Sequence, residues 1–262
     1  MFLIRARYRL AAALLFASLL GIGIFFAAVP PAQTAEPSLT REEIEKIVHD
    51  YLVAHPEILT EMISELESRD RAAAEKSALG AIAEHRKMLD DDGYSFVAGN
   101  PKGDVTVVEF FDYNCGYCKQ VRPSVVALLE SDPNVRLVLK EFPILGPTSV
   151  IATRAAMAAQ KQGAVYWDYH NKMLAHEGRL DEATIFALAG EAGLDVARLK
   201  ADMEDPAIAE RISRTEELAR KIGVDGTPSF VIGDKLAGGA EDLDGLKALV
   251  AAARAKCETC RS

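Results

Sequence analysis

The sequence predicts an α/β domain that is interrupted by a helical block and preceded by a helical extension. Two runs rich in β-branched and aromatic residues, VTVVEFF and NVRLVLKEF, have the composition of buried strands. A stretch with helical spacing separates them, and an alanine-rich helical region follows from about residue 148 to 222. Two short strands, GTPSFVIGD and KLAGGAE, and a closing helix complete the order. Strands that alternate with helices in this way indicate a sheet covered by helices.

Residues 1–35 are predicted to be a signal peptide or a membrane anchor. The basic stretch RARYR precedes an almost unbroken apolar run from Leu10 to Val29. We favour a signal peptide that is removed, although the run is also long enough to span a bilayer as a helix. In both cases we expect the folded part in the periplasm or cell envelope, where disulfides persist.

Residues 36–92 are predicted to form the helical extension. Thr40 and Glu43 have the spacing of a capping box, Pro56 predicts a break, and a third helical stretch begins at Arg71. Apolar residues of the first helix recur on one stripe, which consists of Ile44, Ile47, Val48, Tyr51 and Leu52. The stripe suits a hairpin packed on its own domain or a homo-oligomer formed through residues 40–66, because periodicity shows burial without naming the partner.

The boundaries of the next elements are marked by turn and helix-breaking residues. Residues 90–104, DDDGYSFVAGNPKGD, are rich in turn formers and predict a connection before the first strand. Pro123 lies inside the helical stretch that follows this strand, and it predicts a kink or an early break there.

The motif CGYC, which contains Cys115 and Cys118, lies where the first predicted strand ends and a helix begins. Unpaired backbone N–H groups and the helix dipole at that place favour a thiolate at Cys115. The two-residue spacing brings the two sulfurs close enough to form a disulfide. We therefore expect Cys115 to be the exposed attacking cysteine, and Cys118, one turn deeper, to resolve the mixed disulfide.

A second element suits the same chemistry. Thr227 and Pro228 follow a glycine-containing turn and begin a strand, as a cis-proline loop opposite the dithiol would require, or they form an ordinary turn before an edge strand. Such a loop would present backbone groups to an extended peptide. We expect clients to contact Thr227 and Pro228, together with Gly116 and Tyr117 between the two cysteines.

Residues 93 to 250 resemble the DsbA-like proteins of the thioredoxin superfamily. The resemblance rests on VVEFFDYNCGYCK, KEFPILG, YWDYHNKML, LDEATIFALAGEAGLD and GVDGTPSFVIGD. It implies a thioredoxin fold over residues 93–262 with a helical insertion at about 147–222, a nucleophilic Cys115, a resolving Cys118 and a cis bond before Pro228. It also implies that Glu109 is a buried carboxylate that moves protons to and from Cys118. Strand alternation, which places Glu109 on one face with Val107 and Phe111, favours its burial.

The sequence departs from the strongly oxidising members of that family at the dipeptide between the cysteines. Gly116 and Tyr117 replace the Pro-His pair of those proteins, so one thiolate-stabilising partner is missing and we expect a less oxidising dithiol. The dipeptide looks like that of the periplasmic disulfide isomerases, and the N-terminal helices are similar to those of ScsC-like proteins, which oligomerise through them. The resemblance therefore favours the oligomer, and a disulfide isomerase or reductase over a DsbA-type oxidase.

A disulfide isomerase or reductase of this kind has expected partners and needs no cofactor. We expect the clients to be unfolded or wrongly disulfide-bonded secreted proteins, and a membrane redox partner to reset the dithiol. A net charge of −9 and the lack of a Lys/Arg block exclude nucleic-acid binding through electrostatics. We expect no cofactor and no metal: a zinc site shared with the second pair, Cys257 and Cys260, would need a shaped knuckle that the polar tail lacks.

Three alternatives remain. A non-enzymatic holdase would use the same groove, and a reduced dithiol would bind Cu(I). Cys257 and Cys260 form a local tail disulfide in the simplest interpretation, or a tethered second dithiol that exchanges with the first.

Overall fold

The protein is described by a computed structural model over residues 39–163 and 165–256 of the 262-residue chain. The predicted leader at 1–35 and the pair Cys257 and Cys260 lie outside these residues. Among the helices that are described, none is both long and apolar enough to cross a membrane.

Helix α1 (Arg41–Ala54) forms a unit with the residues around it and is described by itself. It begins with the predicted capping box, in which the Thr40 hydroxyl accepts from the Glu43 backbone N–H and the Glu43 carboxylate accepts from the Thr40 N–H. It ends at Ala54, because Pro56 disfavours helical geometry at the preceding residue. No residue of α1 is buried, so its apolar stripe is open in the single chain.

The second unit begins with α2 (Glu57–Glu84) and α3 (Arg86–Asp90). The predicted separate helix at Arg71 is wrong, because α2 continues through this region. The stretch ESRDRAAAEK contains strong helix formers and neither glycine nor proline, so nothing in it ends the helix. Only the last part of this segment enters the core, through Ile82 of α2 and Leu89 of α3.

Five strands form one mixed sheet in the order β1-β3-β2-β4-β5. The strands are β1 (Phe96–Gly99), β2 (Val105–Phe111), β3 (Val135–Glu141), β4 (Ser229–Ile232) and β5 (Lys235–Gly238). β2 and β3 run parallel, and the other neighbours are antiparallel. Strand β1 was not predicted, because its four residues lie in the turn-rich stretch 90–104 and are defined as a strand by their pairing with β3.

Both faces of the sheet are buried. Alternate residues of β2 point to opposite faces, so Val107 and Phe111 join one core while Val108 and Phe110 join the other. Helices α4 (Gly116–Ser131) and α10 (Leu243–Lys256) contribute to the first core. The second core contains the end of α9 (Pro206–Ile222), together with Ile82 and Leu89. The predicted α/β class with a covered sheet is confirmed.

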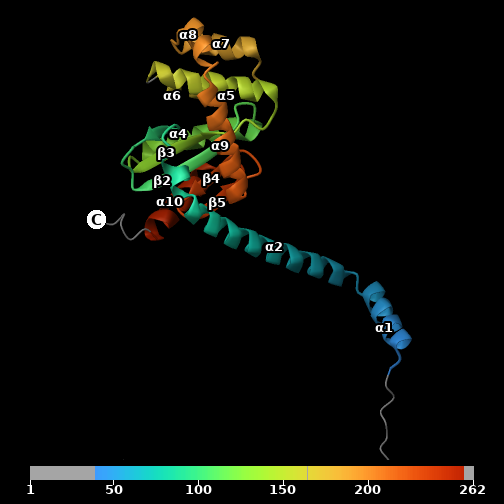
Figure 1. Ribbon diagram of the computed structural model, residues 1–262. Coiled ribbons are helices and arrows are strands. Elements are labelled where there is room, and N and C mark those ends of the chain that lie inside the picture. The colour runs from blue at the N-terminus through green and yellow to red at the C-terminus, as the bar shows by residue number, and fades with distance from the viewer. Residues whose placement is uncertain (1–38, 164, 257–262) are drawn as a thin grey trace, which may run out of the picture. The chain divides into compact units, whose positions relative to one another are not determined.

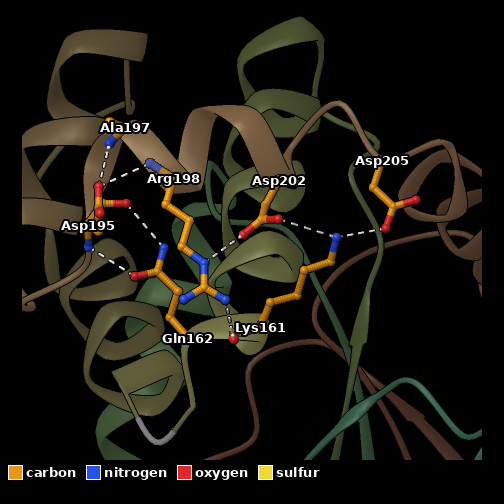
Figure 2. A network of polar contacts seen from close by, with 7 residues as sticks. All are labelled: Lys161, Gln162, Asp195, Ala197, Arg198, Asp202 and Asp205. Atoms are coloured by element: carbon orange, nitrogen blue, oxygen red, sulfur yellow. Dashed lines mark hydrogen bonds and ion pairs between the residues drawn. The ribbon is translucent and has the colours of Figure 1, made fainter.

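A helical block lies between β3 and β4, as predicted, and α9 runs from it back to the sheet (Figure 1). Its elements before α9 are α5 (Pro147–Ala159), the 3₁₀ turn η1 (Gln160–Gln162), α6 (Val165–Ala175), α7 (Glu182–Glu191) and α8 (Val196–Asp202). Polar contacts fasten η1 to the ends of α8 (Figure 2). Lys161 Nζ lies 2.7 Å from Asp205 and 3.6 Å from Asp202, and Gln162 exchanges two hydrogen bonds with the backbone of Asp195.

The predicted kink or early break at Pro123 needs a correction. Helix α4 continues through Pro123 to Ser131. Val121, Val125 and Leu128 lie on its buried side, and this packing outweighs the loss of the one backbone hydrogen bond that proline cannot donate.

Candidate active site

The two cysteines of the motif lie at the N-terminus of α4. Cys115 is the N-cap residue, and its sulfur accepts a hydrogen bond from the Cys118 backbone N–H at 3.3 Å. Its own backbone N–H donates to the Asp112 carbonyl at 3.0 Å, which closes the turn between β2 and α4. Both cysteines are free thiols and both are buried. The strand–turn–helix context expected for the pair is therefore present.

The pKa values of the two thiols are shifted in opposite directions. The pKa of Cys115 is lowered to about 6, first because the Cys118 side chain donates a hydrogen bond to its sulfur. Burial opposes this shift, and backbone N–H groups of the first helical turn support it. The pKa of Cys118 is raised well above its usual range by burial, by its hydrogen bond to Cys115 and by the charge of Glu109. At neutral pH the pair can thus share one proton, which stays on Cys118.

The expectation that Cys115 is exposed is wrong for the resting geometry. Its side chain retains 5% of its surface, and Cys118 is fully covered. The covering group is the loop opposite the dithiol, because the Thr227 carbonyl oxygen lies 3.2 Å from the Cys115 sulfur. The peptide bond between Thr227 and Pro228 is cis, as the resemblance implied. The structure thus brings the cysteine pair and the cis-proline loop together, 112 residues apart in the chain.

Glu109 lies on β2, on the sheet face that carries Val107 and Phe111, and only 2% of its surface is exposed. Its predicted burial is confirmed. Burial raises the pKa of its carboxyl to about 8, and the nearby Cys115 charge adds to the shift. Because Glu109 also raises the pKa of Cys118, the three groups form one electrostatically coupled set.

Sequence reasoning missed Lys119, the residue directly after the motif. Its ammonium donates to the backbone carbonyls of His176, at 2.8 Å, and Gly178. The same loop is held by the Leu180 N–H, which donates to the Asn114 side chain at 2.7 Å. The loop after α6 is therefore fastened beside the dithiol. The only signal in the sequence was the position of Lys119 in CGYCK.

Exposed apolar side chains occur next to the dithiol in the sequence and in the loop that Asp112 holds. Tyr117 is 65% exposed, and Gly116 beside it has no atom near the place where a Cβ would be. Ile144 and Leu145, in the loop after β3, are also exposed, and the Leu145 N–H donates to the Asp112 carboxylate at 2.9 Å.

A buried polar cluster below the site was also missed. It is centred on Glu141 at the end of β3 and includes Tyr113, two residues before Cys115. Its only signal in the sequence is weak, a charged pair KE that ends an apolar strand.

No group of three or more His, Cys, Asp or Glu side chains suited to a metal ion occurs within residues 39–163 and 165–256. The second pair, Cys257 and Cys260, is outside those ranges, so the structure does not test a site that would use all four cysteines.

Two family models match the chain. The model described as the DSBA-like thioredoxin domain matches residues 106–251, and the model described as the copper resistance protein ScsC N-terminal domain matches residues 41–73. The first match contains Glu109, the dithiol and the cis-proline loop, and the second contains α1 and the first part of α2.

Solved structures with similar folds agree with both matches. A thioredoxin-like oxidoreductase from Silicibacter pomeroyi DSS-3 is 45% identical, with a TM-score of 0.64 over 66% of this chain and 99% of that chain. ScsC from Proteus mirabilis, in a transitional conformation, is 31% identical, with a TM-score of 0.64 over 82% of this chain and 97% of that chain.

Curated relatives include much longer proteins. A Na(+)/H(+) antiporter NhaA of Salinispora arenicola is 34% identical over 165 residues, which are 62% of this chain and 25% of the antiporter. The chain thus spans about a quarter of the length of this relative.

Proposed function

This chain belongs to the DsbA-like thioredoxin family, and from that premise we propose that it is a thiol:disulfide oxidoreductase that exchanges disulfides with protein clients. The observation that carries the proposal is the environment of the Cys115 sulfur. It lies at the start of α4, accepts from Cys118, and faces the cis-proline loop at Thr227. This geometry supports a low-pKa nucleophile with a resolving thiol next to it.

In the first step the Cys115 thiolate attacks one sulfur of a client disulfide. A bond forms between Cys115 and that sulfur, the client S–S bond breaks, and the other client sulfur leaves as a thiolate. The Thr227 carbonyl must yield for the attack, because it covers the Cys115 sulfur in the resting geometry. An extended client that binds along Thr227 and Pro228, over Gly116 and Tyr117, would supply the replacement contacts.

In the second step Glu109 serves as the proton acceptor for Cys118. Once Cys115 is in a mixed disulfide its negative charge is gone, so one cause of the raised pKa of Glu109 is removed. The Glu109 carboxylate then accepts the Cys118 proton, and the Cys118 thiolate attacks the Cys115 sulfur. The client leaves as a thiolate and the Cys115–Cys118 disulfide forms, so the client has gained two electrons. Isomerisation follows when a second client thiol attacks the mixed disulfide first.

We assign the net direction to isomerisation or reduction before oxidation. Gly116 and Tyr117 leave the thiolate without a histidine partner between the cysteines, and the hydrogen bonds of Cys118 and the backbone carry its stabilisation. Equilibration of the dithiol with glutathione tests this assignment, because a strongly oxidising potential would favour the DsbA-type oxidase instead.

The cellular setting belongs to the same proposal. We place the folded chain in the cell envelope, delivered there by residues 1–35, with secreted proteins as clients and a membrane protein that resets the dithiol. Fractionation of cells that express the full chain would test the location, and a cytoplasmic pool would contradict it.

The activity is tested with two single variants, Cys115→Ser and, as its matched control, Cys118→Ser. Cys115→Ser should abolish turnover of scrambled disulfide-bonded clients, because the attacking sulfur is gone. Cys118→Ser should accumulate the mixed disulfide, visible as a client adduct on a non-reducing gel. Full refolding activity in Cys115→Ser would support the holdase and contradict the enzyme.

The open stripe of α1 supports a homo-oligomer formed through residues 40–66. Its apolar residues are each about half exposed, and hydrophobic stripes of this kind are normally covered. Light scattering after size exclusion should show an oligomer that Ile44→Glu with Ile47→Glu dissociates. A monomeric wild-type chain would remove this part of the proposal.

Copper binding is a second candidate that the ScsC-type match raises. Residues 41–73 contain no cysteine, so a Cu(I) site built from cysteine sulfurs would use Cys115 and Cys118 or the second pair, Cys257 and Cys260. Titration of the reduced protein with Cu(I), with Cys115→Ser as the control, tests it.

A further inference from the structure

Glu141 is a second buried acid on the sheet face that carries Glu109. It ends β3, lies opposite Phe111 in the register of β2 and β3, and keeps 2% of its surface. Tyr113 and Tyr166 each donate a hydrogen bond of 3.0 Å to its Oε1, and Thr153 donates one of 3.0 Å to its Oε2. One carboxyl thus joins the loop before Cys115 to β3, α5 and α6.

All three partners of this carboxyl are neutral hydroxyl groups. A buried carboxylate without a counter-ion among its partners is costly, and burial raises the pKa of Glu141 to about 8 although the hydroxyls oppose the shift. Asp112 adds to the rise in the pKa of Glu141. Of the other charges, Arg122 lowers the pKa of His170 and Glu109 raises the pKa of Tyr166. Burial without a counter-ion among its hydrogen-bond partners therefore favours the protonated form of this carboxyl.

A protonated Glu141 must donate as well as accept, and the geometry offers one route for this proton. The Tyr113 hydroxyl lies 3.1 Å from Nδ1 of His170 as well as 3.0 Å from Glu141. Burial lowers the pKa of His170 to about 3, so its ring is neutral and one nitrogen is free to accept. In the protonated state Glu141 donates to Tyr113, and Tyr113 donates to His170.

Loss of the proton reverses both hydrogen bonds. The Glu141 proton passes to the Tyr113 oxygen, the Tyr113 proton passes to Nδ1 of His170, and a solvent hydroxide takes the proton from Nε2 of His170, a residue that keeps 3% of its surface. The atoms balance, because one proton is released and His170 stays neutral in the other tautomer. The ionised carboxylate then accepts from Tyr113, Tyr166 and Thr153 together.

We propose that Glu141 is a positioning residue for the dithiol: through Tyr113 it holds the loop that carries Cys115, and through His170 it releases a second proton from the site as the pH rises. The effect of Glu141 on Cys115 matters only for the proposed exchange activity and so rests on it. The titration of Glu141 can be observed without a client. Because Glu141 is joined through Tyr113 to the loop that carries Cys115, we expect a new negative charge there to raise the basicity of the Cys115 thiolate, and a more basic thiolate attacks faster.

The direct test is infrared spectroscopy of the reduced full chain between pH 6 and pH 10. Glu109→Gln removes the other acid on this face of the sheet whose pKa is raised to about 8, and it serves as the reference variant. The Glu109→Gln chain should keep one protonated carboxyl band, from Glu141, that disappears near pH 8. The double variant, which carries both Glu109→Gln and Glu141→Gln, should lack that band. Tyr113→Phe in the Glu109→Gln chain should shift the band, because one hydrogen bond to the carboxyl is lost. Absence of a titrating band in Glu109→Gln would overturn the proposal even if the double variant failed to fold.

The effect on the dithiol is measured by alkylation of Cys115 over the same range. The rate in Glu109→Gln should rise about two- to threefold near pH 8, above the plateau set by the thiolate. In the double variant the alkylation rate of Cys115 should stay constant over this pH range once the thiolate is fully formed. Identical profiles would contradict the role of Glu141. Failure of disulfide exchange in the wild-type chain, with the titrating band present in Glu109→Gln, would count against the proposed activity alone.

Discussion

Lys140 and Glu141 are neighbours in the sequence and are buried on opposite faces of the sheet. The Lys140 ammonium contacts the Asp92 carboxylate at 2.6 Å and donates to the Met88 carbonyl at 2.7 Å. Glu141 meets only hydroxyl donors among its hydrogen-bond partners. The charge on the face away from the dithiol is therefore neutralised by an ion pair, and the acid on the dithiol face is left to hold its proton.

This difference separates a structural use of buried charge from a chemical one. The ion pair fixes the segment after α3 onto β3. Burial raises the pKa of Asp92, but the charge and hydrogen bond of Lys140, together with the hydrogen bonds from Ser95, outweigh burial and lower it. On the other face Glu109 and Glu141 both have pKa values raised to about 8, close to the working range of a thiol. Buried acids whose pKa lies near neutrality can exchange protons, whereas a paired ion cannot do so without breaking its pair.

The largest expected effect is that of Lys140→Met. It leaves the Asp92 carboxylate buried without its partner, which should lower the free energy of unfolding by about 3–5 kcal/mol. Denaturant titration measures this loss. Lys140→Met with Asp92→Asn should recover part of it, and the pKa of Cys115 should stay unchanged in both. A shifted pKa of Cys115 would mean that the two faces are not independent.

Glu109→Gln should raise the free energy of unfolding, in contrast to the loss expected for Lys140→Met. The pKa of Glu109 is higher in the folded chain than in the unfolded one, so the folded state binds more protons and stability falls as the pH rises from about 4.5 to 8. Removal of the acid should raise the free energy of unfolding by about 2–4 kcal/mol at pH 8 and change it little at pH 4. Equal effects at both pH values would show that Glu109 is ionised in the fold. The same variant should slow the resolution of a mixed disulfide, which single-turnover quenching would measure.

The smallest expected effect concerns the polar contacts of η1. Lys161 is partly exposed, and its pairs with Asp202 and Asp205 are screened by solvent. Lys161→Met should lower the melting temperature by no more than about 2 °C, with less change in high salt. A loss as large as that of Lys140→Met would contradict the distinction between buried and exposed pairs.

The elements that follow periodicity and composition could be predicted from the sequence. The capping box at Thr40, the strands around CGYC and the burial of Glu109 all follow from local patterns. Strand β1 could not be found in this way, since four residues in a turn-rich stretch become a strand only through pairing with β3. Pro123 was misjudged because packing of α4 outweighs a local helix breaker.

The dithiol and its loop were predictable because their residues form recognisable motifs. Glu141 was not, because its partners Tyr113, Thr153 and Tyr166 come from three separate segments. The resting cover of Cys115 by Thr227 was missed for the same reason, since sequence spacing does not show how closely a distant loop approaches.

We expect the groups that open α4 to keep the Cys115 sulfur ionised at neutral pH, and the exchange activity depends on this ionisation. The most direct measurement is the thiolate absorbance of the reduced chain between pH 4 and pH 10, with Cys115→Ser to assign the signal. We expect a midpoint near pH 6, with the thiolate fraction falling as the pH drops below it. A midpoint near that of free cysteine, about 8.5, would contradict the account.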